Sequence, residues 1–365
     1  MKAYLLKLYK SFLNSKLITK IFVILSLIIY AAILSITLIK VEYEVIMPGG
    51  LTPVSDYINI DTDKKMGEVY TVSVYTKREI SLFQKWIGKL NPHLDLEKYD
   101  PKNVLTNEED IKQGEIYRNL SIKYSVIVAY TEAMKNNPNV NITYEFTGAV
   151  IYHKFKNTPK ELSLGDTITK VNGEPVTIDN YEKILLRNSP IDTDTCNVNQ
   201  KEITLTVIKE GKREETDIIV NDNCNKKYLI EAFLLPDFNI KEATPKFNQK
   251  KINNLGPSGG LMQTLGIYNA LVDEDVTKGY RIVGTGTINL NGTSGIIGGV
   301  KQKIITAQLI DLLYNYPIDI FFVTADNFKE AKYIYERLPN PSFELIEVNS
   351  FSAVLEHLNK KVAKK

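Results

Sequence analysis

The chain has 365 residues, of which 44% are hydrophobic, so it is long enough for two or three domains with sizeable cores. Its formal net charge is +2, and five lysines among the first twenty residues leave the remainder at about −3. This near-neutral balance argues against a protein that binds polyanions, so we expect no nucleic acid among its partners.

The N-terminus combines a basic stretch, residues 1–20, with an uncharged apolar stretch, residues 21–39. At about 1.5 Å per residue the apolar stretch is long enough to cross a hydrocarbon core of about 30 Å. Because the lysines precede it, we expect a single-pass membrane anchor with a cytoplasmic N-terminus and an extracytoplasmic remainder. A cleaved signal peptide is the alternative, but its apolar region is usually shorter, and "KVEYEV" offers no small-x-small cleavage site.

The next segment, residues 41–140, has the pattern of a mixed α+β region. A strand is predicted at 67–75, a polar surface loop at 91–114 and a helix at 120–137. No arrangement of residues in this segment indicates a chemical function.

Residues 142–222 are rich in predicted strands. "EFTGAVIYHKF" is a strand, "LSLGDTITKVNGEPV" is two strands around an Asn-Gly turn, and "IDNYEKILLRN" is a short helix. A hairpin then joins 202–208 to 215–220. Cys196 and Cys224 lie nearly equidistant from the centre of this hairpin, which favours a structural disulfide in an extracytoplasmic protein, with two free thiols as the alternative.

The pattern LxxGDxIxxVNGxxV, here Leu162 to Val176, together with the helix and hairpin that follow, resembles a PDZ domain. Such domains bind an extended peptide by strand addition and hold its terminal carboxylate with backbone N–H groups. The resemblance implies that "FTGAV", with Gly148, forms the carboxylate-binding turn. The alternative is that this glycine serves only the geometry of a turn.

From residue 243 to residue 365 helix and strand patterns alternate, which predicts a packed α/β domain. The predicted order is a helix from Ser258, a hairpin at 280–297, a helix from Lys301, a strand at 318–325, a helix at 327–338, a strand at 343–350 and a helix at 351–362.

Several kinds of active site are excluded by what the sequence lacks. There are only three histidines, none in a catalytic-looking turn, and neither cysteine lies in the C-terminal domain. No P-loop motif and no plausible cluster of metal ligands occurs, so we expect no metal, no other cofactor and no ATP. Ser258 and the lysines therefore remain as the candidates for catalysis.

Ser258 stands in "NLGPSGG" at the start of a predicted helix. A hydroxyl there is a common helix N-cap. The same position is also suited to a nucleophile, because free backbone N–H groups at a helix N-terminus can stabilise an oxyanion.

Two lysines in "GGVKQKII" are candidates for the base. On a helical wheel Lys301 lies at the edge of the stripe formed by Ile305, Leu309, Leu312 and Leu313, whereas Lys303 falls on the opposite side. Burial against apolar surface lowers the pKa of a lysine and can leave a neutral amine. The wheel therefore favours Lys301.

Taken together, "GPSGGLM", "GTGTINLNGTSGIIGGVKQK" and "IFFVTADNFKEA" resemble the proteolytic domain of the Lon peptidases. The resemblance implies that Ser258 is the nucleophile, Lys301 the general base and Thr285 a residue that orients the lysine amine. The backbone N–H groups of Leu255 and Ser258 would form the oxyanion hole. Leu255 stands where ATP-dependent Lon enzymes carry an aspartate.

The whole chain resembles the membrane-anchored, PDZ-containing Lon-like proteins of bacteria. We therefore expect an ATP-independent serine endopeptidase with a Ser–Lys dyad, whose PDZ-like domain presents or gates protein and peptide substrates. A homo-oligomer is implied only by analogy. The alternative function is a catalytically silent, membrane-tethered scaffold that binds peptides.

Overall fold

The computed structural model describes residues 2–101, 105–186, 202–222 and 227–364. Cys196 and Cys224 lie outside these ranges, so the expected disulfide stays a prediction. The chain divides into two compact units, one formed by residues 1–47 and 75–104 and the other by residues 48–74 and 105–365. Strands β1 (Tyr43–Pro53) and β3 (Val69–Lys77) each run from one unit into the other along the chain.

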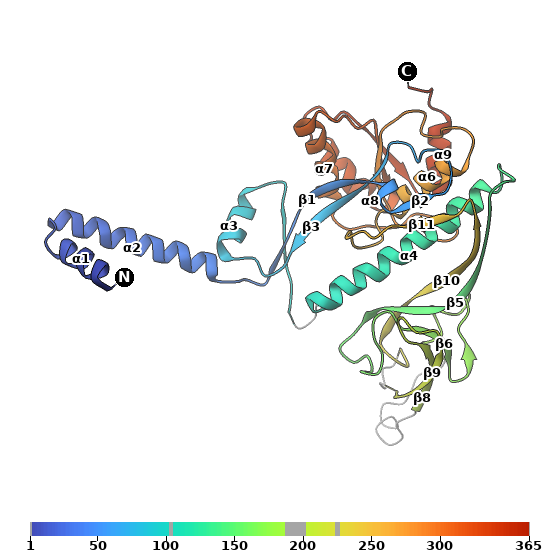
Figure 1. Cartoon of the computed structure of the whole chain (residues 1–365), viewed down its shortest axis with the longest axis horizontal. Coiled ribbons are helices and arrows are strands. Elements are labelled where there is room, and N and C mark those ends of the chain that lie inside the picture. Colours follow the sequence, from blue (N-terminus) through green and yellow to red (C-terminus); the bar gives the residue numbers. More distant parts are fainter. Residues whose placement is uncertain (1, 102–104, 187–201, 223–226, 365) are drawn as a thin grey trace. The chain divides into compact units, whose positions relative to one another are not determined.

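The first unit is built around two N-terminal helices, drawn in dark blue in Figure 1. Helix α1 (Lys2–Leu13) is followed by α2 (Leu17–Leu38), which contains the predicted apolar segment and has no buried residue. By length and composition α2 could cross a membrane. A short helix, α3 (Leu82–Leu90), and strand β4 (Asp95–Lys98), which pairs antiparallel with the start of β1, complete this unit.

The second unit contains a sheet in which β12 lies between β13 and β3. The strand order is β14-β13-β12-β3-β1, and β12 pairs parallel with both β3 and β13. Both β12 and β13 are buried along their whole length, as expected for parallel strands covered on both faces. The strand bounds are Ile282–Thr285 for β12, Ile320–Thr324 for β13 and Glu344–Val348 for β14.

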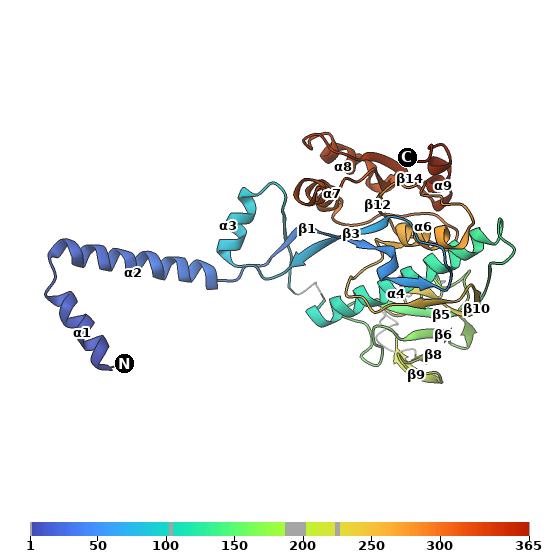
Figure 2. The same ribbon diagram turned by 45° about the horizontal axis from the view of Figure 1, so that its top comes forward.

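Five helices of the described ranges surround this sheet. They are α4 (Asn107–Ala133), α6 (Gly260–Leu271), α7 (Val300–Tyr314), α8 (Ala325–Tyr335) and α9 (Phe351–Asn359). The candidate lysines lie in α7, and Ser258 lies in the turn before α6. A 3₁₀ turn (Val54–Asp56) leads into a small two-stranded sheet of β2 (Ile58–Ile60) and β11 (Phe247–Gln249). Helix α4 contacts both α6 and β5, and Figures 1 and 2 show it between α6 and the β5–β10 pair.

The predicted β-rich region forms a separate antiparallel sheet with the order β10-β5-β6-β8-β9. The Asn-Gly turn is confirmed, because Asn172 and Gly173 both have positive φ values, 50° and 79°, between β6 and β7. The hairpin of β8 and β9 is also confirmed. The strand bounds are Asn141–Lys154 for β5, Thr167–Val171 for β6, Glu174–Pro175 for β7, Glu202–Ile208 for β8, Glu215–Asn221 for β9 and Ala232–Thr244 for β10.

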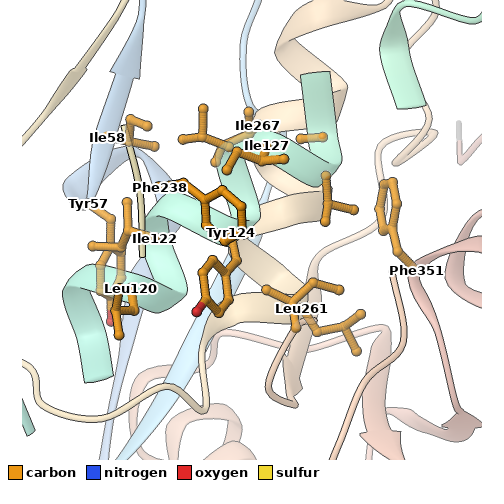
Figure 3. Close-up of a cluster of buried hydrophobic side chains, with 14 of the residues drawn as sticks. Tyr57, Ile58, Leu120, Ile122, Tyr124, Ile127, Phe238, Leu261, Ile267 and Phe351 are labelled. Carbon is orange, nitrogen blue, oxygen red and sulfur yellow. The ribbon is translucent and has the colours of Figure 1, made fainter. Parts of the chain in front are cut away.

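A hydrophobic core joins α4 to its neighbours. Figure 3 shows Tyr124 and Ile127 of α4 together with Leu261 and Ile267 of α6 and Phe238 of β10. The ring of Tyr124 meets that of Phe238 edge to face at 6.2 Å. The segment 41–140, which showed no function in the sequence, thus supplies the helix against which the Ser258 turn is packed.

Three local predictions are wrong. Residues 107–114 begin α4 instead of belonging to a loop, because Thr106 and Glu109 form a capping box that starts the helix within this polar stretch. Residues 280–297 do not form a hairpin. They contain one strand, β12, which pairs in parallel with β3 and β13, and an irregular connection that follows it. The predicted helix at 178–188 is a series of turns over the residues described there.

Gly148 does not form a ligand-binding turn. It lies inside β5, opposite Asp237 of β10, at a register shift, with φ of +139°. A Cβ atom at this position would lie 2.7 Å from the carbonyl oxygen of Ile168 in β6. Because β10 and β6 take the two edges of β5, this strand has no free edge here to which a peptide strand could add.

Candidate active site

The turn before α6 presents the Ser258 hydroxyl without using it as a cap. The N-cap residue of α6 is Gly259, and no side chain caps this helix. Within the described ranges, the Ser258 Oγ has no hydrogen-bond partner. The turn needs Gly256, whose φ of +83° is readily adopted only by glycine. The structure thus favours a reactive over a capping role for this hydroxyl.

Helix α4 fixes the backbone of this turn from one side. The Gly256 N–H donates to the Gly114 carbonyl at 2.9 Å, and Ser121 Oγ donates to the Pro257 carbonyl at 3.1 Å. Arg118 donates to the Asn254 carbonyl at 3.1 Å. These three hydrogen bonds fix the backbone of the turn at Asn254, Gly256 and Pro257.

The close approach of α4 also explains the second glycine after Ser258. A Cβ atom on Gly260 would lie 2.7 Å from Ser121 Oγ and 3.1 Å from the backbone nitrogen of Ile288. Ser121 belongs to α4 and Ile288 to the connection after β12, so a larger residue would push α6 away from both. Glycine at this position therefore permits the close packing of α6 against these two segments.

Thr285, at the end of β12, holds the turn from the other side. Its side chain is fully buried, and its Oγ1 donates to the Ser258 carbonyl at 3.1 Å. The neighbouring Gly286 N–H donates to the same carbonyl at 2.8 Å. The end of β12 and the Ser258 turn are thus fixed to each other.

Lys303, and not Lys301, is the lysine that contacts Thr285. The Lys303 Nζ donates to Thr285 Oγ1 at 3.0 Å, and the residue is only 2% exposed. Burial lowers the pKa of Lys303 to about 7. A large fraction of this amine is therefore neutral near pH 7, as a general base requires.

The placement of the two lysines on the helical wheel is wrong. Lys301 is partly exposed, and residues 302–308 are buried on all sides of the helix. The stripe that favoured Lys301 relied on Leu312 and Leu313, which are 61% and 70% exposed at the other end of α7. A helical wheel assumes that the same face is buried along the whole helix. In α7, residues 302–308 are buried on all sides, whereas Leu312 and Leu313 are exposed.

The two amides expected to bind an oxyanion come from the same turn. Over the described part of the chain, the N–H groups of Leu255 and Ser258 donate to no backbone carbonyl. The Leu255 side chain, which stands where an acidic group is missing, is 47% exposed. In the sequence, one of these amides belongs to Ser258 itself and the other to Leu255, three residues earlier.

His357 takes no part in this site. Its ring packs edge to face against Phe322 at 5.6 Å, and burial lowers its pKa. Among the described residues no group of three or more acidic, histidine or cysteine side chains could hold a metal ion. The polar groups gathered at the Ser258 turn are therefore a hydroxyl, a buried amine and backbone amides.

A comparison with known families matched the C-terminal part of the chain. Residues 230–360 match the model of the Lon protease (S16) C-terminal proteolytic domain, a range that contains Ser258, Thr285 and Lys303. A comparison with curated proteins gave no match.

Proposed function

Because this chain is a Lon-like peptidase that carries a serine peptidase domain of the S16 family, we propose that it cleaves peptide bonds with a Ser258–Lys303 dyad. One observation supports this assignment most strongly. The buried Lys303 amine donates a hydrogen bond to Thr285 Oγ1, and Thr285 Oγ1 donates one to the Ser258 carbonyl. This replaces the Lys301 of the sequence-based hypothesis.

In the first step, neutral Lys303 accepts the proton of Ser258 Oγ while this oxygen attacks the carbonyl carbon of the substrate. The N–H groups of Leu255 and Ser258 stabilise the resulting oxyanion. When the tetrahedral intermediate collapses, the Lys303 ammonium gives its proton to the leaving amine. An acyl-enzyme ester on Ser258 remains.

In the second step, a water molecule attacks this ester and loses its proton to Lys303. Collapse of the second intermediate releases the carboxylic acid and returns the proton to Ser258 Oγ, so the dyad is restored. Thr285 Oγ1 accepts a hydrogen bond from the amine and donates one to the Ser258 carbonyl, so it holds the amine in place. Thr285 is thus a positioning residue.

A catalytically silent scaffold is the competing function, and the burial of Lys303 argues against it. Burying a lysine with a pKa of about 7 costs folding free energy at neutral pH without improving a peptide-binding surface. Such a cost is common at catalytic sites, where a shifted pKa serves the reaction.

The test is labelling with a fluorophosphonate, which reacts with activated serine hydroxyls, together with cleavage of an unfolded protein substrate. We expect the purified full-length protein to be labelled and to cleave, and Ser258→Ala to lose both while keeping its circular dichroism spectrum. Labelling and cleavage that persist in Ser258→Ala would contradict the assignment. A wild-type protein that neither reacts nor cleaves would favour the scaffold.

We also propose that α2 anchors the peptidase to a membrane. The N-terminus would lie in the cytoplasm and the peptidase site on the extracytoplasmic side. The support for this anchor is the apolar length of Leu17–Leu38 after a lysine-rich start. Resistance of the full-length protein to alkaline extraction from membranes would support the anchor. Release into the supernatant would contradict it.

The antiparallel sheet is proposed to select substrate segments, although not at Gly148. A cavity of about 250 Å³ lies between the start of β10 and the turns at residues 181–186. Its lining includes four aromatic residues, Tyr152, Tyr181, Tyr228 and Phe233. Aromatic walls of this kind suit an apolar side chain of an extended peptide. We expect Phe233→Ala to raise KM for a protein substrate and to leave kcat unchanged; a loss in kcat alone would contradict this role.

A further inference from the structure

Helix α3 (Leu82–Leu90) exposes its apolar face. At 100° per residue, Leu82, Phe83, Trp86, Ile87 and Leu90 fall within an arc of about 140°. Trp86 and Leu90 are 61% and 68% exposed, and Leu82 and Ile87 are also exposed. A helix that packed on its own unit through this arc would bury these side chains.

The opposite side of α3 is the side that packs on the chain. Gly88 is buried, and a Cβ atom there would lie 3.1 Å from the Leu96 side chain of β4. A capping box of Ser81 and Gln84 fixes the first turn. The orientation of α3 is therefore determined by contacts on its polar side, and its apolar face points outward from them.

The start of α3 lies directly at the end of α2. The Leu82 N–H donates to the Ile39 carbonyl at 2.9 Å, and the Val41 N–H donates to the Ile80 carbonyl at 3.0 Å. Ile36 of α2 and Trp86 of α3 line one apolar cavity of about 350 Å³. If α2 crosses the bilayer, α3 begins where the hydrocarbon core ends.

The charged residues of α3 fit the same place. Lys85 and Lys89 lie next to the apolar arc on the wheel and also line the cavity. The Lys85 Nζ lies 3.6 Å above the ring of Tyr43. Tryptophan and lysine are the residues that anchor proteins at the boundary between acyl chains and headgroups.

We propose that α3 lies in the membrane interface of the leaflet next to the peptidase, with its apolar face in the upper acyl region and its lysines at the lipid phosphates. This inference rests on the proposed membrane anchor. With α2 it gives the chain two points of attachment to the bilayer, which limits how freely the segment after the anchor can tilt.

Trp86 allows a direct test because it is the only tryptophan of the chain. The full-length protein is reconstituted into vesicles of phosphatidylcholine and phosphatidylglycerol, with and without brominated acyl chains. We expect blue-shifted emission that brominated lipid reduces roughly twofold or more and that aqueous iodide quenches weakly, as for a ring at interface depth. Strong iodide quenching without an effect of brominated lipid would overturn the proposal.

A matched variant separates α3 from the anchor. In Trp86→Phe/Tyr30→Trp the reporter lies in α2, so brominated lipid must quench it if α2 is in the bilayer. Quenching of this variant but not of wild-type Trp86 would overturn the inference and leave the anchor intact. Quenching of neither would contradict both. Emission shielded from iodide but insensitive to brominated lipid would show a protein surface covering α3 and would also overturn the inference.

Discussion

The two halves of α7 differ in how deeply their side chains are buried. Its first turns, from Gln302 to Gln308, are buried on every side, and Lys303 is held there against Thr285. Its last turns expose Leu312 and Leu313. Burial by the neighbouring elements, more than the side-chain pattern of the helix, therefore favours Lys303 as the proposed base.

The largest expected effect comes from replacing Lys303, with Lys301 as the matched control. We expect Lys303→Ala to lower kcat by about 10³-fold or more, because the proton acceptor for Ser258 is lost. The matched Lys301→Ala should stay within about threefold of wild type. Steady-state cleavage of a fluorogenic peptide measures both. A large loss in Lys301→Ala together with an active Lys303→Ala would restore the original hypothesis.

Replacing Lys303 by an apolar side chain of similar length should abolish activity but increase the stability of the fold. The pKa of Lys303 is lowered to about 7 in the folded state, so wild type bears the full penalty below pH 7 and loses it as the pH rises toward 10.5. We expect Lys303→Met to be more stable by roughly 3–5 kcal/mol at pH 6, with the difference shrinking toward pH 10. Urea unfolding at several pH values measures this.

In that experiment a constant difference between pH 6 and pH 10 would mean that the Lys303 amine is not desolvated. Lys301→Met, the same substitution at a partly exposed position of this helix, serves as the control.

Apolar truncation compares the two halves of α7 directly. We expect Ile304→Ala, in the fully buried half, to cost about 2–4 kcal/mol through lost burial and a cavity. Leu313→Ala, in the exposed half, should change stability by less than about 0.5 kcal/mol. Chemical denaturation gives both values. A large cost at Leu313 would instead show that another surface covers the end of α7.

The smallest effect is expected at the residue that positions the amine. Thr285→Val keeps the shape but removes the acceptor for Lys303 and the donor to the Ser258 carbonyl, so we expect kcat to fall about 10–100-fold with KM nearly unchanged. Thr285→Ser should recover most of the activity. Failure of serine to rescue it would assign Thr285 a packing role only.

Much of the C-terminal domain could be predicted because its signals are local. The strand before Thr324 and the helix and strand that follow it are at the predicted positions, since each combines its own periodicity with its own turn. The Ser258 turn was identified from its glycines for the same reason. The parallel pairing of β12 with β3 could not be predicted, because its partner lies more than two hundred residues away along the chain.

The choice of Lys303 as the proposed base depends on tertiary burial, which the pattern of a single helix does not encode. Lys303 is buried beside the end of β12, whereas Lys301, two residues earlier, is partly exposed. Gly148 was misplaced for a similar reason, because a glycine forced by the close approach of β6 has the same sequence signature as a turn glycine. The Thr106–Glu109 capping box was readable and marks the start of α4.

The most direct test of the dyad is the pH dependence of fluorophosphonate labelling at Ser258. We predict that the labelling rate of wild type and of Lys301→Ala rises as the pH increases through about 7 and then levels off, because the neutral Lys303 amine is the base. Lys303→Ala should lose this step. A wild-type rate without an inflection near pH 7, or an inflection that persists in Lys303→Ala, would contradict the assignment of Lys303.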